Sequence, residues 1–195
     1  MRQPINKNVE CEELAEIISK NLRYIESFIK TNRNNFNLSE NGASRFLVSV
    51  LRLSNGLEEG VAELLRYEHG YSTKKISRYN YRECMAVYAT INAFIKEDSF
   101  VVLRAMRNAF AHAARPLPLI FRLLEDEQTL FDTSAFRVKV CAENYTIDIF
   151  LAELKRNCAY IAERLRTIPA KEEIQIKEAV RTGELDSKRR KKHPR

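Results

Sequence analysis

The sequence predicts an all-α protein, an antiparallel bundle of four to five helices. Only five glycines and five prolines interrupt its 195 residues, and apolar residues recur at every third or fourth position, which is the spacing of one helix face. Hydrophobic residues make up 45% of the chain and charged residues 30%, a balance typical of a globular protein with a buried core. The length fits one domain, which is expected over residues 1–187.

Five helices are expected from this spacing, and two of them are long and come first. The expected helical ranges are residues 9–31, 39–69, 80–96, 99–113 and 146–168. In the second helix, Gly56 and Gly60 indicate a kink or a close contact with another helix. Gly70 follows the last periodic residue, where a helix C-cap would lie. The buried face of the second helix is expected to hold Phe46, Leu47, Val50, Leu53, Leu57, Val61, Leu64 and Leu65.

Capping residues mark the starts of the third and fourth helices. Asn80, with Glu83 three residues later, has the pattern of a capping box. Asp98 or Ser99 can cap the fourth helix, which ends before Pro116 because proline disfavours helical backbone at the residue that precedes it.

The last helix is preceded by a segment of a different kind. Over residues 136–140, apolar and basic residues alternate, which is typical of a strand. A single strand would have no partner, so we interpret the segment as an extended connection or a small hairpin. Thr146 or Asn144 can cap the helix that follows, and Pro169 stops it.

The positive charge of the chain is concentrated at its C-terminus. The net charge is +7, and six of the 33 basic residues lie in the last eight. The sequence predicts a disordered basic tail over residues 188–195. It can attract nucleic acid or an anionic surface, or it can serve only as a solubilising end, and both interpretations stay open. Its consecutive basic residues are Lys188, Arg189, Arg190, Lys191 and Lys192.

Several classes of protein are not expected. No apolar stretch approaches the roughly 20 residues that span a bilayer, and the first residues lack the apolar core of a secretory signal, so we expect a cytoplasmic protein without membrane contact. Four scattered cysteines form no C-x-x-C pair, so neither a metal site nor a cofactor is expected. They are interpreted as reduced core residues: Cys11, Cys84, Cys141 and Cys158.

The fourth helix carries the most informative residues of the chain. At about 100° per residue, Leu103 and Met106 face the core, while Asn108 and His112 fall on the opposite side. Arg107 lies at the border between the two faces, and its side chain is long enough to fold toward the imidazole. An arginine, an amide and a histidine are thus expected together at one helix end.

These three groups have the chemistry needed to cleave a phosphodiester. A histidine gives or takes a proton near neutral pH, and a guanidinium matches phosphate oxygens with two parallel hydrogen bonds. RNA supplies its own nucleophile, so His112 could handle the 2′-OH or leaving-group proton while Arg107 stabilises the phosphorane and Asn108 orients either group. The alternative is structural, because a histidine at a helix end can simply bond the last carbonyls.

The wording of this stretch resembles the signature of a known superfamily. From residue 106 to 113 the chain reads Met-Arg-Asn-Ala-Phe-Ala-His-Ala, followed by Arg-Pro-Leu at residues 115–117. This is similar to the Arg-Asn-x-x-x-His motif on a late helix of the HEPN superfamily, whose members are helical bundles. The wording is most similar to the branch named after the mannitol-operon repressor. Outside the motif, only the order of the helices agrees.

The resemblance implies a metal-independent endoribonuclease, often a toxin or defence effector, whose paired protomers share one cleft. It implies that Arg107 and His112 are catalytic, that Asn108 supports them, and that the partners are RNA, a second copy of the chain, and an antitoxin or regulatory protein. The mannitol-repressor branch implies the alternative of a non-catalytic transcriptional regulator or binding module. A purely structural helical subunit is the third alternative.

Further basic residues are candidates for binding nucleic acid. Arg104 and Arg115 flank the motif and can extend a phosphate-binding surface, or they can form ordinary surface ion pairs. Lys74, Lys75 and Arg78 alternate with tyrosines, a pattern that can hold single-stranded RNA by charge and stacking. The same pattern also occurs at the ends of amphipathic helices, which is the simpler interpretation of these three residues.

Overall fold

The computed structural model describes residues 8–32, 40–112 and 145–170. For Glu40, Asn41, Ala43 and residues 109–112, it describes the backbone alone. Within these ranges the chain forms helices joined by turns and contains no β-strand, so the all-α prediction is confirmed there. The helices are α1 (Val9–Asn32), α2 (Glu40–His69), α3 (Thr73–Ile76), α4 (Tyr81–Ile91), α5 (Glu97–His112) and α7 (Ile147–Arg166).

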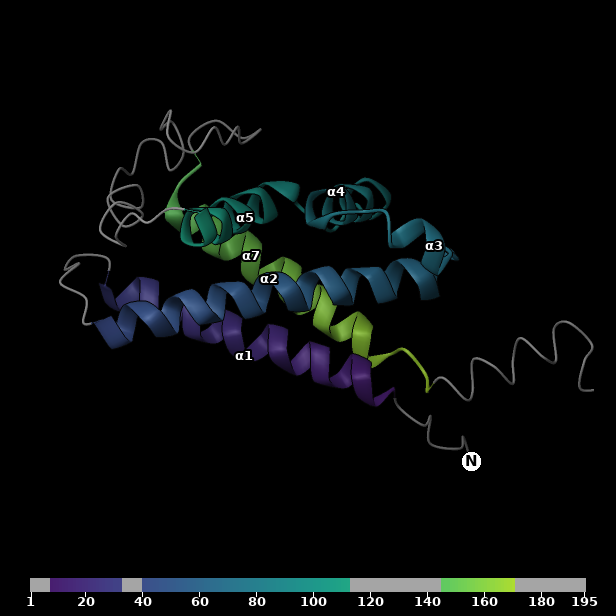
Figure 1. Ribbon diagram of the computed structural model, residues 1–195, viewed down its shortest axis with the longest axis horizontal. Helices are drawn as coiled ribbons and strands as arrows, with labels where there is room; N and C mark the ends of the chain where they lie inside the picture. The colour runs from purple at the N-terminus through teal and green to yellow at the C-terminus, as the bar shows by residue number, and fades with distance from the viewer. Residues whose placement is uncertain (1–7, 33–39, 113–144, 171–195) are drawn as a thin grey trace, which may run out of the picture.

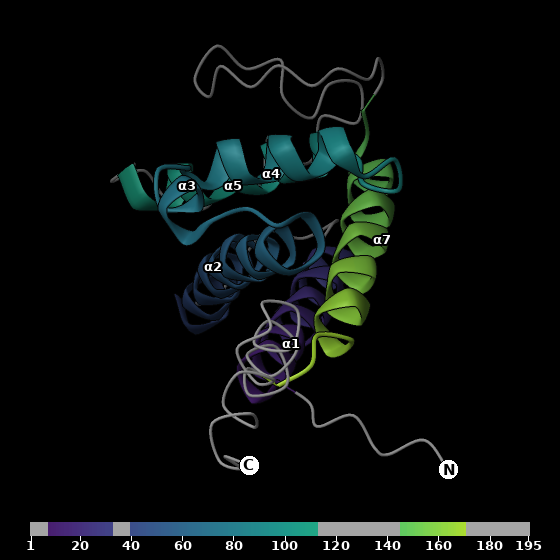
Figure 2. The same cartoon turned by 90° about the vertical axis from the view of Figure 1, so that its right-hand side faces the viewer.

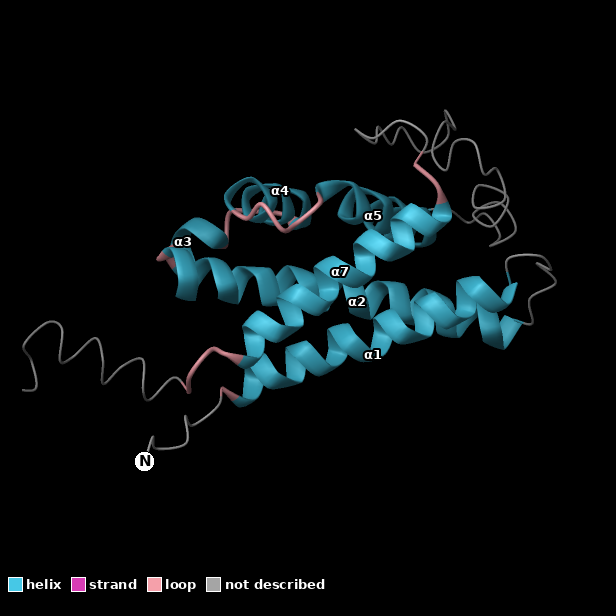
Figure 3. Ribbon diagram, turned by 180° about the vertical axis from the view of Figure 1, so that it is seen from behind, coloured by secondary structure: helices cyan, strands magenta, loops and turns pink. Residues whose placement is uncertain are grey.

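Helix α1 packs on one side of α2, and helices α4 and α5 pack on the other side, while α7 contacts α1, α2 and α5 (Figure 1, Figure 2). Helices α1 and α2 lie side by side along the long axis of the molecule, and α7 passes obliquely across them (Figure 1). Helices α4 and α5 lie on the side of α2 away from α1 (Figure 2). Seen from behind, α7 runs from α5 to the far end of α1 (Figure 3). Helix α2 therefore packs against α1, α4, α5 and α7.

The apolar face predicted for α2 is the centre of the core. Seven of its eight residues are buried, and only Leu47 is partly exposed. On α1, Ile18, Leu22, Ile25 and Ile29 are buried, whereas the neighbouring Ile17 stays 39% exposed.

Gly56 and Gly60 of α2 mark close helix contacts, which confirms one of the two interpretations of their presence. A Cβ atom on Gly60 would lie 2.9 Å from Leu165 Cδ1 of α7 and 3.4 Å from Ile18 Cδ1 of α1. A Cβ atom on Gly56 would lie 3.1 Å from Ile17 Cγ2. The missing side chains therefore let both neighbouring helices approach the backbone of α2.

Helix ends are formed as the local sequence predicts at several positions. Gly70 adopts a φ of +66°, and the Gly70 N–H donates to the Arg66 carbonyl while the Tyr71 N–H donates to the Leu65 carbonyl. This is the glycine C-cap expected after α2. Asn80 and Glu83 form the predicted capping box at the start of α4.

The prediction of one helix over residues 80–96 is wrong over its last five residues. Helix α4 ends at Ile91, because Asn92 takes an extended conformation and its side-chain oxygen accepts a hydrogen bond from the Phe94 N–H. Asparagine side chains commonly form such turns in competition with helical hydrogen bonding. The residues that follow α2 were expected to be a connection, but four of them form the short helix α3, capped by Ser72.

The start of α5 also differs from the prediction, since neither Asp98 nor Ser99 caps it. The helix begins at Glu97, and both residues lie inside its first turn. The capping role falls to Asn157 of α7, whose amide oxygen accepts from the Lys96 N–H at 3.2 Å. The same amide donates to the Lys96 carbonyl at 2.7 Å and to Ser99 Oγ at 2.9 Å. A residue distant in the sequence thus supplies a cap that local patterns cannot reveal.

The last helix is formed as predicted, whereas two other predicted segments lie outside the described residues. Thr146 caps α7, which ends at Arg166 just before the expected boundary. The extended segment at residues 136–140 and the basic tail at residues 188–195 lie outside the described residues. No helix in the described part of the chain is long and apolar enough to cross a membrane.

Replacing Asn157 by alanine should lower the free energy of unfolding by about 2–4 kcal/mol, because three hydrogen bonds to a fully buried amide are lost and the Lys96 backbone groups are left unpaired. Urea unfolding followed by circular dichroism measures this change. Asn21→Ala is the matched control, since Asn21 is also buried but its amide bonds only a carbonyl of its own helix. An equal loss in both variants would contradict the proposed capping role.

Candidate active site

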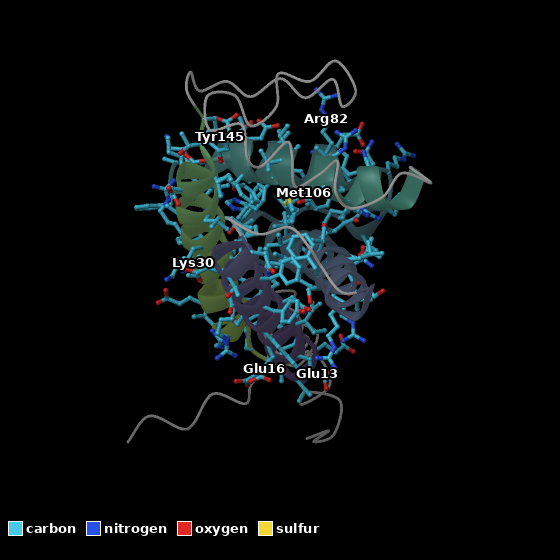
Figure 4. The ribbon with its side chains drawn as sticks, turned by 90° about the vertical axis from the view of Figure 1, so that its left-hand side faces the viewer. Glu13, Glu16, Lys30, Arg82, Met106 and Tyr145 are labelled. Carbon is cyan, nitrogen blue, oxygen red and sulfur yellow. The ribbon has the colours of Figure 1, made fainter. Side chains whose placement is uncertain are left out.

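Helix α5 has the two faces that the sequence predicts. Leu103 and Met106 are 0% and 3% exposed, and Figure 4 shows Met106 directed from α5 into the interior of the molecule. Asn108 is exposed and Arg104 is half-buried. The side chain of His112 lies outside the described part, so the structure places this residue only by its backbone, in the last turn of α5.

Arg107 lies at the border of the two faces and contacts two neighbouring helices. Its Nη1 atom lies 3.7 Å from Glu58 Oε2 of α2, and the two side chains are 31% and 34% exposed. The guanidinium carbon lies 6.0 Å from the centre of the Tyr81 ring of α4, within the range of a cation–π interaction. Arg107 is therefore oriented by a carboxylate and an aromatic ring while it still reaches solvent.

The contact between Arg107 and Glu58 is weak enough to be exchanged. At 3.7 Å it is an ion pair without a hydrogen bond, and ion pairs between partly exposed side chains contribute about 0–1 kcal/mol. A phosphate offering two charge-assisted hydrogen bonds to the guanidinium can compete with it.

Tyr81 provides the aromatic ring against which the Arg107 guanidinium lies. The residue is 5% exposed, and its hydroxyl has no hydrogen-bond partner among the described residues. Burial raises the pKa of this phenol far above its ordinary value, although the nearby Arg107 and Arg104 act in the opposite direction. Tyr81 is therefore a neutral ring at neutral pH, and it cannot serve as a base.

Apart from those on α5, the structure describes three of the basic residues predicted to bind nucleic acid, and these three lie outside α5. Lys74, Lys75 and Arg78 are exposed on and just after α3, the element that leads into α4. The ammonium of Lys75 lies 4.0 Å from the centre of the Tyr71 ring, so this pairing of basic and aromatic residues is present within the chain itself. Arg115 and the five consecutive basic residues of the tail lie outside the described residues.

The described residues include three buried cysteines but no candidate metal site. No cluster of three histidine, cysteine or acidic side chains that could hold a metal is found in the described ranges. Cys11, Cys84 and Cys158 are buried and form no disulfide with one another, as the core interpretation predicts. Burial, followed by the nearby Glu58 and Glu83, raises the pKa of Cys84 to about 11. Cys141 lies outside the described residues.

Sequence analysis did not identify Glu58 as part of this site. Its position gives a weak signal, because Glu58 and Glu59 follow Leu57 of the buried stripe and one of the two acids must lie near the edge of that stripe. Which helix would face this edge depends on how α4 and α5 pack against α2, and helical spacing does not specify that packing.

The chain was compared with models of protein families, with curated proteins and with solved structures, and none of the three comparisons gives a match. The likeness to the HEPN superfamily therefore rests on the motif of α5 alone.

Replacing Tyr81 by phenylalanine should leave stability unchanged or raise the free energy of unfolding by up to about 1 kcal/mol, because a buried hydroxyl without a described partner is removed. Tyr145→Phe is the matched control. The Tyr145 hydroxyl donates to Glu153 at 2.6 Å, so its loss should cost about 1–2 kcal/mol. Thermal unfolding of both variants measures the difference, and a destabilised Tyr81→Phe variant would show that its hydroxyl does have a partner.

Proposed function

We propose that the chain is a HEPN-like, metal-independent endoribonuclease that acts as a homodimer. The observation that carries this proposal is the position of Arg107, which is oriented by Glu58 and Tyr81 yet remains 31% exposed on the helix that carries His112. The exposed amide of Asn108 is the next residue on that helix. A toxin or defence effector, held in check by an antitoxin, is the biological role that fits this activity.

The chemistry needs no group from outside the chain and its substrate. The 2′-oxygen of a ribose attacks the adjacent phosphorus, the bond to the 5′-oxygen breaks, and the products are a 2′,3′-cyclic phosphate and a 5′-hydroxyl. Arg107 stabilises the extra negative charge of the phosphorane, and Asn108 positions a phosphate oxygen. His112 carries the proton that the 2′-hydroxyl loses or the one that the 5′-oxygen gains. Two paired chains supply one imidazole for each transfer.

His112→Ala should lower the rate of RNA cleavage by about 100-fold or more, because proton transfer by a positioned side chain contributes at least that factor. Cleavage by the unaltered protein should persist in excess EDTA. The measurement is the appearance of fragments ending in 2′,3′-cyclic phosphate, made together with the mass of the protein in solution.

The control for this prediction is His69→Ala. His69 lies in the last turn of α2, where its Nε2 atom is 3.8 Å from Glu68 Oε2, and its loss should leave the rate unchanged. Cleavage that requires a metal, or that survives in His112→Ala, would exclude the proposed mechanism.

Glu58→Gln should raise the affinity for a single-stranded RNA by about twofold to fivefold, because it removes the carboxylate that competes with phosphate for Arg107. Glu59→Gln removes the same charge from the next residue, which has no ion pair among the described residues. It should change the affinity less, and fluorescence anisotropy at fixed salt measures both variants. Equal effects would mean that the charge acts at long range and not through Arg107.

A non-catalytic regulator similar to the mannitol-operon repressor is the second candidate. The ion pair with Glu58 favours it, because this carboxylate competes with phosphate for the Arg107 guanidinium. In this case no cleavage appears under any condition. Removing residues 188–195 would then weaken nucleic-acid binding and reduce its dependence on salt.

A further inference from the structure

A cavity of about 380 Å³ opens between α2, α3 and the start of α4. This volume lies within the range of about 300–1,000 Å³ that is typical of small-molecule sites. Asn55, Glu58 and Glu59 of α2 provide the polar part of its lining. Glu58 therefore belongs both to this cavity and to the ion pair with Arg107. Among the described side chains of the proposed catalytic residues, neither Arg107 nor Asn108 lines the cavity.

The polar wall of the cavity is negatively charged. Two carboxylates and one amide line it, and none of the described side chains in the lining is basic. In the described part of the chain, Glu59 has no salt bridge, and Glu58 has only the contact of one oxygen with Arg107 at 3.7 Å. Both carboxylates thus retain the capacity to accept hydrogen bonds from a guest.

The rest of the cavity lining is apolar or aromatic. Ile76 of α3 and Cys84 of α4 are 8% and 2% exposed, and Ala62 and the half-buried Tyr79 complete the lining. The high pKa of Cys84, about 11, keeps its thiol neutral, and Glu58 contributes to this shift. A guest would therefore meet both negative charge and a neutral, apolar surface in this cavity.

The ion pair of Arg107 indicates which functional group suits this wall. Its guanidinium lies against Glu58 on one side and against the ring of Tyr81 on the other. The cavity offers the same combination, with Glu58 and Glu59 as carboxylates and Tyr79 as the ring. Cations bind favourably to aromatic faces and form charge-assisted hydrogen bonds with carboxylates.

We propose that this cavity binds a small organic cation, a primary amine, amidine or guanidine attached to a compact apolar body. The cationic group pairs with Glu58 and Glu59 and bonds the Asn55 side chain, while the apolar body packs against Ile76, Ala62 and the Tyr79 ring. Small anions are disfavoured because the two carboxylates of the lining repel them. Binding of a cation at this site does not require ribonuclease activity. A negative result for cation binding would therefore leave the catalytic proposal standing, and the reverse also holds.

The test uses three ring compounds of nearly equal shape, namely benzamidine, benzamide and benzoate, with isothermal titration calorimetry on the full chain. Benzamidine should bind at least about tenfold more tightly than neutral benzamide, which is the usual contribution of one charge-assisted hydrogen bond. Benzoate should not bind. Equal affinities for benzamidine and benzamide would overturn the proposal.

Three variants locate the binding. Glu58→Gln should weaken benzamidine binding about tenfold, and Ala62→Leu should abolish it by filling the cavity while keeping both carboxylates. Glu16→Gln, at the end of the molecule away from α4 and α5 (Figure 4), is the matched control and should bind as the unaltered chain does. Circular dichroism confirms that each variant is folded. If folded Ala62→Leu binds benzamidine normally, the cation lies elsewhere and the proposal fails.

Discussion

The position of α5 depends on one buried amide. Asn157 is 0% exposed and bonds the N–H and carbonyl of Lys96 together with the hydroxyl of Ser99. These bonds fix where α5 begins relative to α7. Because an α-helix has a regular rise and turn per residue, the position of its first turn determines where each later side chain lies. Arg107 comes about three turns further along. Its guanidinium contacts Glu58 and Tyr81 only if the first turn of α5 stays in place. The geometry of the candidate site on α5 therefore depends on the hydrogen bonds from α7.

Glu58 is the residue on which two proposed activities meet. One of its oxygens faces Arg107, and its side chain also lines the cavity beside α3. A carboxylate shared between two cations binds each less tightly than it would bind either alone. A cation in the cavity would therefore loosen Arg107, and a phosphate on Arg107 would free Glu58 for the cation. By thermodynamic linkage the two effects must be equal in size.

Local sequence information predicted the helices well and their packing poorly. The positions of α1, α2 and α7 followed from long apolar stripes, and the caps at Gly70, Asn80 and Thr146 from contacts between residues close in the chain. The early end of α4 was missed because an asparagine can also lie inside a helix. Asn92 ends this helix through its extended backbone and the bond from the Phe94 N–H to its side chain. The cap from Asn157 and the contact of Arg107 with Glu58 join residues far apart in sequence. Such contacts depend on how whole helices dock, and periodicity does not encode that information.

The two ends of the described helical core lie together. The Asn8 N–H donates to the Ile168 carbonyl at 3.3 Å, just before α1 and just after α7. Neighbouring ends of this kind are common in domains that tolerate circular permutation. A covalent link across this point would close the core into a ring without moving α1 or α7. The arrangement of the helices would then be independent of where the polypeptide starts.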